Sequence, residues 1–265
     1  MKRFAPLIAI AFVSIVTPAF AEMNIDVVVD GLNNPWEMIF APNGDIYFSE
    51  RDGRVWKIEN FGEAKVIETF PKSGSMEGGT LGLALHPDFK NNQKIYVYQT
   101  NLELEFFQNK VFSFTVNGDA LTDKQVIIDG IPGAPWHDGG RINFGPDGKL
   151  YITTGDAINP GWSQDLSSLA GKILRINPDG TIPDDNPFDS SPIFSYGHRN
   201  PQGIAWSDDG LFVSSEHGPS GEMGHGHDEI NVIVKGKNYG WPKVVGDSSD
   251  DIFVNPIIHS GQSTW

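Results

Sequence analysis

The sequence predicts an all-β protein of the propeller class, because one strand–turn–strand phrase recurs at regular intervals and turn residues are abundant. The phrase is an apolar strand, a Pro/Asp/Gly turn and a strand rich in aromatic and β-branched residues. It occurs four times, over residues 38–48, 83–98, 142–152 and 204–213. Asn-Gly and Asp-Gly pairs between such runs are strong hairpin signals, because their turns need positive φ.

The spacing of the phrase favours propeller blades. The four turns begin at positions 42, 87, 146 and 207, which are 45, 59 and 61 residues apart. Propeller blades typically take about 40 to 50 residues, more with loop insertions. A third short strand follows three of the copies, over residues 54–58, 110–114 and 172–176. Four-stranded blades explain this repeat better than a β-sandwich does.

Composition limits the kinds of protein that this chain can be. Its 265 residues suit one large all-β domain, and its 30 glycines and 18 prolines are spread along the chain, as tight turns require. No long amphipathic helix is expected, and at most a short helical turn near residues 164–169. The absence of cysteine excludes disulfides, cysteine–zinc sites and thiol catalysis.

The N-terminus resembles a secretory signal. Lys2 and Arg3 supply a positive start, residues 4–16 are almost wholly apolar, and Ala19-Phe20-Ala21 provides a small-x-small cleavage pattern. We therefore expect a signal peptide over 1–21, a propeller domain over 22–265, and export to the periplasm or the extracellular space. An uncleaved anchor is the alternative, although the apolar stretch is short for a membrane span.

The strong negative charge argues against a nucleic-acid partner. The chain carries a formal net charge of −15, and removal of Lys2 and Arg3 with the signal would take it to −17. Phosphate binding needs basic patches, which such a chain lacks. The charge suits a protein that binds cations, or one that simply stays in solution.

Four polar clusters lie beside the repeated hairpins, at residues 77–82, 136–141, 153–156 and 196–203. In a propeller, the loops that enter the inner strands gather at one mouth of the central channel, so residues distant in sequence converge there. Oxidation of an alcohol by hydride transfer needs a base and a fixed cation. His137 could act as the base, Asp156 could orient it, and Arg199 could stabilise charge on the acceptor. The alternative is that these side chains cap turns and pair on the surface.

A fifth cluster joins residues 215–219 to residues 228–231. Glycine, proline and acidic residues in one loop indicate calcium, which takes backbone carbonyls and carboxylates, although an exposed acidic loop explains them equally well. Between these segments, His225 and His227 are separated by one residue. They could hold a transition metal, but a flexible loop is the favoured interpretation because no further ligand is identifiable.

Together the clusters resemble the PQQ-dependent soluble glucose, aldose and sorbosone dehydrogenase family. The matching pieces lie in the same order along residues 31–265, and their spacing makes the match specific. They include Leu81-Gly82-Leu83-Ala84-Leu85-His86-Pro87-Asp88-Phe89, Trp136-His137-Asp138-Gly139-Gly140-Arg141, Gly155-Asp156, Gly197-His198-Arg199-Asn200-Pro201, His217-Gly218-Pro219, Asp228-Glu229-Ile230-Asn231 and Asn238-Tyr239-Gly240-Trp241-Pro242.

The resemblance implies a six-bladed β-propeller and a role for each matching residue. His137 would deprotonate the anomeric hydroxyl of an aldose, with Asp156 supporting it, and the product would be a lactone. The implied PQQ-binding residues are Arg199, Asn200 and His217, and the implied sugar contacts are Glu77 and Asp138. Calcium would bind at the carbonyls of Gly218 and Pro219, and a structural calcium at Asp228, Glu229 and Tyr239. Electrons would pass to an external acceptor.

Two departures from the family pattern are visible. Glu77 stands where some glucose-oxidising members have glutamine, which fits the broader aldose branch. The sequence stops at Trp265, where the family continues, so we expect an incomplete propeller of about four to five blades and a cofactor site that lacks its C-terminal part. Two other functions are therefore considered: a calcium-dependent lactonase-like propeller hydrolase, and a non-catalytic exported propeller that binds a protein or glycan.

Overall fold

The computed structural model describes residues 26–103, 105–220 and 226–264. The chain divides into two units, residues 1–30 and 31–265, and the second contains every strand and helix named below. The predicted signal peptide over 1–21 lies outside the described residues. Within the described ranges, no helix is both long and apolar enough to cross a membrane.

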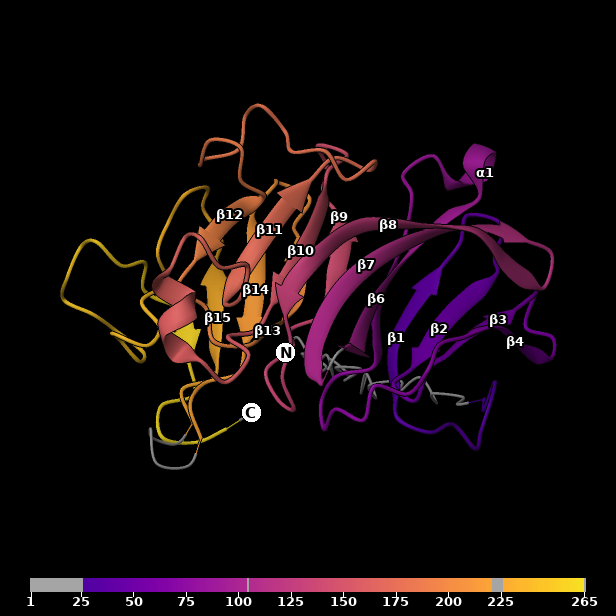
Figure 1. Cartoon of the computed structure of the whole chain (residues 1–265), viewed down its shortest axis with the longest axis horizontal. Helices are drawn as coiled ribbons and strands as arrows, with labels where there is room; N and C mark the ends of the chain where they lie inside the picture. Colours follow the sequence, from indigo (N-terminus) through magenta and orange to yellow (C-terminus); the bar gives the residue numbers. More distant parts are fainter. Residues whose placement is uncertain (1–25, 104, 221–225, 265) are drawn as a thin grey trace, which may run out of the picture. The chain divides into compact units, whose positions relative to one another are not determined.

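The second unit consists of four antiparallel sheets of four strands each, here called blades 1 to 4 in chain order (Figure 1). Blade 1 contains β1 (Pro35–Phe40), β2 (Ile46–Glu50), β3 (Arg54–Ile58) and β4 (Ala64–Thr69). Blade 2 contains β5 (Thr80–Leu85), β6 (Lys94–Glu103), β7 (Phe106–Asn117) and β8 (Ala120–Pro132). Blade 3 contains β9 (Ile142–Phe144), β10 (Leu150–Thr154), β11 (Lys172–Ile176) and β12 (Ile193–Tyr196). Blade 4 contains β13 (Pro201–Trp206), β14 (Phe212–Glu216), β15 (Glu229–Val232) and β16 (Ile258–His259).

This architecture confirms the predicted propeller and its repeat. Each of the four predicted phrases forms the first hairpin of a blade, and sequential strands pair throughout each sheet. The predicted third strands coincide with β3 and β11 and lie inside β7. The described residues contain four blades, which is the lower of the two numbers expected.

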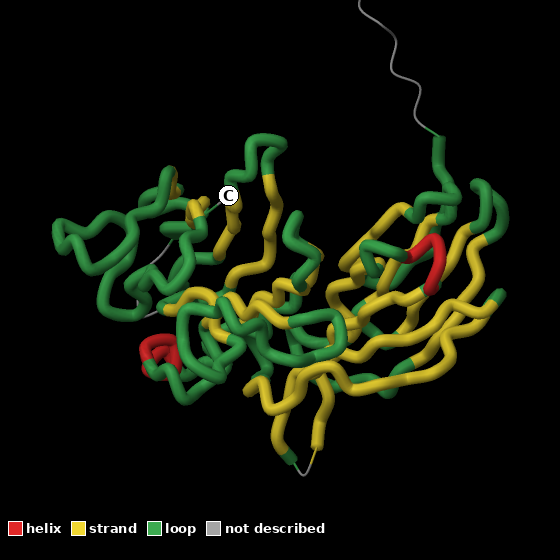
Figure 2. The backbone as a smooth tube through the Cα atoms, turned by 90° about the horizontal axis from the view of Figure 1, so that it is seen from above, coloured by secondary structure: helices red, strands yellow, loops and turns green. Residues whose placement is uncertain are grey.

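Three local predictions differ from the structure. The short turn expected near 164–169 lies at 166–167, but the helical part comes earlier: a 3₁₀ helix spans Pro160–Gln164, where Pro160 has the φ angle that a first helical turn needs. A second short helix, α1 (Phe89–Asn92), lies in the β5–β6 connection and was not expected. The segment interpreted as a calcium loop is partly a strand, because Glu229 and Ile230 pair with β14 on one side and β16 on the other. Figure 2 shows the two short helices in separate loops outside the strand scaffold.

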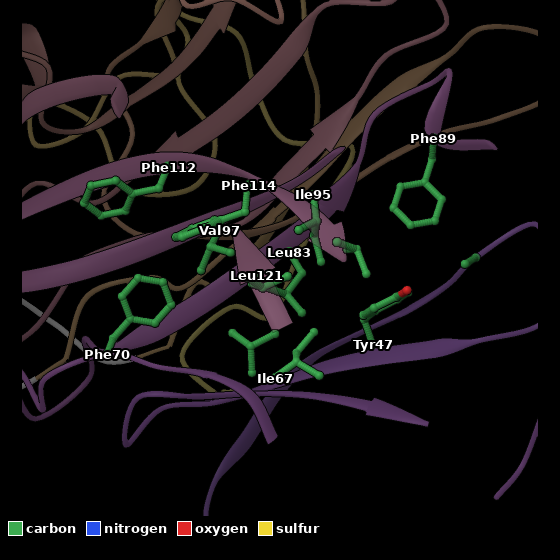
Figure 3. Packing of buried hydrophobic residues seen from close by; sticks show 13 residues of the cluster. Tyr47, Ile67, Phe70, Leu83, Phe89, Ile95, Val97, Phe112, Phe114 and Leu121 are labelled. Carbon is green, nitrogen blue, oxygen red and sulfur yellow. The ribbon is translucent and has the colours of Figure 1, made fainter. Parts of the chain in front are cut away.

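Apolar side chains pack between consecutive blades. The cluster between blades 1 and 2 is drawn in Figure 3, where Tyr47 and Ile67 of blade 1 face Leu83, Ile95 and other residues of blade 2. Fully burying an aliphatic or aromatic side chain of this size stabilises the fold by about 1.5–3 kcal/mol. These contacts hold neighbouring blades together, and the hydroxyl of Ser49 in β2 adds a hydrogen bond of 2.6 Å to the carbonyl of Leu81 in β5.

Blade 3 shows how one sheet serves two neighbours. Successive side chains of a strand point to opposite faces. In β10, Leu150 and Ile152 therefore pack in the cluster shared with blade 2, whereas Tyr151 packs against Trp206 and Phe212 of blade 4. This arrangement fixes the hairpin ends of adjacent blades next to one another, and these ends carry the polar clusters found in the sequence.

Candidate active site

His137 and Asp156 form a hydrogen-bonded pair at the end of blade 3. His137 lies in the connection from β8 to β9, and Asp156 follows β10 directly. The imidazole Nδ1 lies 2.7 Å from Oδ1 of Asp156, whose side chain is completely buried. A carboxylate accepts a hydrogen bond from Nδ1–H, so this contact orients the ring and leaves Nε2 as the basic atom. Within the described ranges, no group forms a hydrogen bond with Nε2.

The carboxylate of Asp156 is held by two further donors. Its Oδ2 accepts a hydrogen bond of 2.8 Å from the indole Nε1 of Trp241, and its Oδ1 accepts one of 2.9 Å from the backbone N–H of Ile158. Its own backbone N–H donates to the carbonyl of Arg199 at 2.7 Å. Asp156 is therefore fixed by donors from three parts of the chain, and its position is independent of any ligand.

The backbone of His137 is in an unusual conformation. Its φ is 65°, in the left-handed region that non-glycine residues seldom adopt. Its N–H donates to Oε2 of Glu77 at 2.9 Å, and its carbonyl accepts from the N–H of Ala157 at 3.2 Å. Gly155 lies so close that a Cβ there would be 1.8 Å from the His137 carbonyl oxygen. The Gly-Asp pair at 155–156 is thus needed for the loops to meet, and local strain of this kind is typical of functional sites.

Arg199 and Asn200 approach from the connection between β12 and β13. The Arg199 side chain is buried, and its guanidinium donates to the carbonyl of His217 at 3.3 Å and to Oγ of Ser220 at 3.5 Å. It also lies 5.5 Å from the centre of the Trp241 ring. No carboxylate of the described residues forms an ion pair with it, and burial lowers its pKa from the ordinary value. The nearby carboxylates of Asp156, Glu216, Glu77 and Asp228 partly offset this effect of burial on the pKa. Since none of them forms a direct ion pair with it, the guanidinium can still donate to an anionic ligand.

Asn200 connects the two sides of the site. Its Oδ1 accepts from the N–H of Gly139 at 3.0 Å, and its Nδ2 donates to Oε2 of Glu77 at 3.3 Å. Glu77 therefore receives donors from blade 3 and from the β12–β13 connection. This network joins residues that are 123 positions apart in the sequence.

These residues surround a cavity of about 250 Å³. Eight predicted residues contribute to its wall: Glu77, His137, Arg199, Asn200, His217, Gly218, Pro219 and Asp228. Ser220 and Thr264 complete the lining. Asp156 lies behind His137 rather than in the wall, as a residue that supports a base does. Its volume is just below the range of about 300–1,000 Å³ that is typical of small-molecule sites.

Asp138, expected to contact the sugar, is absent from this cavity wall. It is 1% exposed, and its carboxylate accepts hydrogen bonds from Nδ2 of Asn109, the N–H of Ala134 and the hydroxyl of Ser75. Burial raises the pKa of Asp138 to about 6. His137 therefore faces the cavity, whereas Asp138 faces Asn109 in β7 of blade 2. The geometry does not support a substrate contact for Asp138.

The last residue of the same motif, Arg141, links blades. It forms an ion pair with Glu37 of β1, its Nε donates to the carbonyl of Gln202 at 2.8 Å, and its guanidinium lies 4.2 Å from the Trp36 ring centre. These partners belong to blades 1 and 4, while Arg141 precedes β9 of blade 3. Arg141 thus serves the packing of the inner strands.

The expected calcium-binding residues are divided between two places. Gly218 and Pro219 line the cavity, and the N–H of Gly218 donates to Oδ1 of Asp228 at 2.8 Å, which holds this turn. The His217 side chain is 55% exposed, and its Nε2 lies 3.2 Å from Oε1 of Gln202. A turn with two carbonyls next to an unpaired arginine fits a calcium ion together with an anionic cofactor.

The second predicted calcium site, around Glu229, also has features of a cation site. Glu229 and Glu216 are directly opposite in the β14–β15 pair, and burial together with Glu216 raises the pKa of Glu229 to about 7. Ser214 and Asn231, two positions along the same face, each carry a buried oxygen without a hydrogen-bond partner. Calcium prefers oxygen ligands of this kind, but both carboxylates already accept hydrogen bonds: Glu216 from His198 and the N–H of Arg199, and Glu229 from Asn231 and the N–H of Gly246.

Asp228 and Glu229 line one cavity, whereas the hydroxyl of Tyr239 is used elsewhere. The Tyr239 hydroxyl donates to the carbonyl of Val232 at 2.6 Å and accepts from the N–H of Val234 at 2.8 Å, so only its backbone is left for a ligand role. No group of three or more His, Cys, Asp or Glu side chains in the described part of the chain has metal-binding geometry. His225 lies outside the described residues, and His227 stacks on His259 at 5.3 Å.

Trp241 is the important residue to which the sequence assigned no role. It belongs to the quoted Asn-Tyr-Gly-Trp-Pro segment, it is 6% exposed, and it touches both Asp156 and Arg199. A buried indole N–H usually has a hydrogen-bond acceptor. A tryptophan between glycine and proline was therefore a sign in the sequence that a polar partner lies nearby. Its acceptor, 85 positions earlier in the chain, could not be identified from sequence.

The fold and the cavity define a β-propeller with a candidate acid–base site built from the loops at the ends of its blades. The family profile described as Glucose / Sorbosone dehydrogenase matches residues 32–255, and the chain belongs to this family. The predicted resemblance is therefore confirmed.

Similar proteins with curated descriptions agree with the family. The chain is 34% identical over 259 residues to quinoprotein glucose dehydrogenase B of Acinetobacter calcoaceticus, in a match that covers 84% of this chain and 53% of that protein. It is 34% identical over 253 residues to aldose sugar dehydrogenase YliI of Escherichia coli K12, covering 89% and 66%. The chain thus spans between about half and two thirds of these relatives.

Solved structures give the same result. A glucose dehydrogenase-type putative oxidoreductase of Thermus thermophilus matches with a TM-score of 0.85 and 43% identity, covering 90% of this chain and 73% of that chain. The PQQ-bound aldose sugar dehydrogenase of Streptomyces coelicolor matches with a TM-score of 0.81 and 38% identity, covering 89% and 70%. The four blades therefore correspond to part of a six-bladed propeller.

Proposed function

We propose that this protein takes part in the PQQ-dependent oxidation of aldose sugars to lactones. The observation that carries the proposal is the orientation of His137. Its Nδ1 is hydrogen-bonded to Asp156, and its Nε2 has no partner among the described residues. His137 and Arg199 line the same cavity. A base and an unpaired cation on one cavity are the groups that hydride removal from an alcohol requires.

His137 would accept the proton of the anomeric hydroxyl at Nε2, while its Nδ1–H remains bonded to Asp156. The buried carboxylate would stabilise the imidazolium that forms, as in other histidine–carboxylate pairs. The sugar loses this proton and a hydride from the anomeric carbon, so that the C–O bond becomes the carbonyl of a lactone. PQQ, when bound, would accept the hydride as a two-electron oxidant, and an external acceptor would then remove the electrons.

Arg199 would hold negative charge at the opposite side of the cavity. Because its guanidinium is buried, its attraction for an anionic oxygen is greater than that of an exposed arginine. Asn200 and His217 would contribute to the cofactor side of the cavity, and the carbonyls of Gly218 and Pro219 would bind calcium there. The likeness to the PQQ-bound Streptomyces relative supports PQQ as the cofactor of this fold.

Glu77 would contact the sugar. Its carboxylate accepts from the N–H of His137 and from Asn200, so it already couples the base to the cofactor side. A carboxylate accepts hydrogen bonds from sugar hydroxyls of several configurations, which favours a broad range of aldoses. Export to the periplasm or extracellular space, suggested by residues 1–21, is part of the same proposal. A hydrolase with several carboxylates on one metal has no corresponding cluster in the described ranges.

The test is a dye-linked assay of the protein reconstituted with PQQ and calcium. Wild-type protein should reduce the dye when an aldose is added, and leaving out PQQ or calcium should remove the activity. His137→Ala should lower kcat by at least about a hundredfold, since general bases contribute about 10²–10⁴-fold. His86→Ala removes a histidine outside the cavity and serves as the matched control. Turnover that persists without PQQ, or that survives His137→Ala, would refute the proposal.

A further inference from the structure

Lys172, the first residue of β11, has its whole side chain inside the protein. Its exposed fraction is 0%, and its Nζ donates hydrogen bonds to three backbone carbonyls, those of Ala170 at 2.6 Å, Trp162 at 2.7 Å and Ser163 at 3.1 Å. No carboxylate of the described residues forms an ion pair with it. All three donors of the ammonium group are therefore used by one loop.

A buried ammonium group without a counter-ion is costly for the fold. Lysine is almost never fully buried unless it is paired, and burial lowers the pKa of Lys172 to about 7. A methionine of similar length would fill this space without that cost. What methionine cannot do is donate to the three carbonyls. The lysine therefore acts on the loop that carries them, the β10–β11 loop (residues 155–171).

The β10–β11 loop is bound in turn to the segment that contains Arg199. The carbonyl of Ser163 accepts from the N–H of Gly197 at 2.9 Å, and its hydroxyl donates to the carbonyl of His198 at 2.6 Å. The N–H of His198 donates to the carbonyl of Gly171 at 3.2 Å. Of the residues that Lys172 holds, Ser163 thus contacts the Gly197–Asn200 turn itself, and Ala170 directly precedes Gly171, which also contacts it.

The same loop reaches Trp241 and Asp156. Nε2 of Gln164 donates to the carbonyl of Trp241 at 2.7 Å, and the side-chain amides of Gln164 and Asn238 bond to each other at 2.8 and 2.9 Å. Trp241 then donates to Asp156, which stands at the start of the loop. The β10–β11 loop therefore contacts both the support of the base and the turn of the unpaired arginine.

We propose that Lys172 is a positioning residue, whose ammonium group ties the β10–β11 loop to blade 3 and so sets Asp156 and Arg199 for the reaction. This inference rests on the proposed function and extends it to a residue that touches neither substrate nor cofactor. Through the loop, Lys172 keeps the His137–Asp156 hydrogen bond formed before any ligand binds.

The first test uses the protein without PQQ, so it does not depend on turnover. In Lys172→Met, we expect amide exchange protection at Asp156, Gly171 and His198 to fall at least about tenfold, because the loop opens locally. The low-field NMR resonance of the His137 Nδ1 proton should weaken or move upfield. Lys149→Met removes a lysine from the same blade and should change neither quantity.

The second test measures the reaction. Lys172→Met should lower kcat by about tenfold or more with little change in KM for the aldose, because misplacement of catalytic groups affects the chemical step. Lys172→Gln supplies two N–H donors and should fall between wild type and the methionine variant in both loop protection and kcat. It also provides the comparison if the methionine variant does not fold.

The outcomes separate the two proposals. Wild-type loop protection and an unchanged His137 resonance in Lys172→Met would overturn the positioning role, whatever the activity. Equal effects of the methionine and glutamine variants would also overturn it, because donors to the carbonyls would then be irrelevant. Absence of PQQ-dependent turnover in wild type would refute the proposed function, while the exchange and NMR results would still decide the role of Lys172.

Discussion

Asp138→Asn offers a quantitative test of how the loop behind the site is held. The carboxyl group is 1% exposed, and burial raises its pKa from 3.8 to about 6. The unfolded chain releases this proton near pH 3.8, whereas the folded protein keeps it to about pH 6. Between these values the folded state binds more protons, so the free energy of unfolding falls as pH rises. Over this pH range the free energy of unfolding should fall by about 3 kcal/mol in total.

The assay is urea denaturation of wild type and Asp138→Asn at several pH values from about 4 to 7, which span the two pKa values. An asparagine is always neutral and keeps the acceptor for Asn109 and the N–H of Ala134. The stability of the variant relative to wild type should therefore rise by about 3 kcal/mol across this range. Asp129→Asn, an exposed change in β8, should leave the wild-type curve unaltered.

Parallel curves for wild type and Asp138→Asn would refute the reasoning, because the carboxyl group would then have the same pKa in both states. Kinetics of the variant add a second result. Since Asp138 faces away from the cavity, KM for an aldose should stay within about threefold of wild type. A large increase in KM would instead restore the substrate contact expected from the sequence.

Two further predictions concern the contacts of the His137–Asp156 pair. Gly155→Ala should lower the free energy of unfolding in urea by about 2–3 kcal/mol, because the new Cβ would lie 1.8 Å from the His137 carbonyl oxygen. Gly161→Ala, whose nearest neighbour lies at 3.5 Å, is the control and should be neutral. Equal stabilities of the two variants would contradict the close approach. Trp241→Phe removes the N–H bonded to Asp156 and should cost about 1–3 kcal/mol and lower kcat. Unchanged stability and kcat would show that this hydrogen bond has no role.

Much of the fold could be predicted because its signals are local. Asn43-Gly44 lies between two apolar runs, and Gly44 adopts the positive φ of 90° that the turn needs. Asp147-Gly148 likewise precedes the apolar run Leu150-Tyr151-Ile152, which forms part of β10. The segment at 228–231 was misinterpreted because its acidic residues suggested a loop, although Ile230 and Val232 alternate with polar residues as in a strand.

The site was less predictable than the fold. Histidine, aspartate and arginine in glycine-rich loops indicated which residues were candidates, and the propeller topology predicted that they meet. Neither could show that His137 faces the cavity while its neighbour Asp138 faces blade 2. Lys172 resembled an ordinary strand-end lysine, and its three carbonyl partners became visible only with the loop in place.

The sequence alone therefore determined the repeat, the hairpins and the family, because turn chemistry and strand alternation act between residues close together in the chain. The tertiary structure alone decided which polar side chain faces which partner. Glu77 and Asn200 are 123 positions apart, and Asp156 and Trp241 are 85 positions apart. Such contacts depend on how the blades pack, and no local pattern encodes the direction in which a loop side chain points.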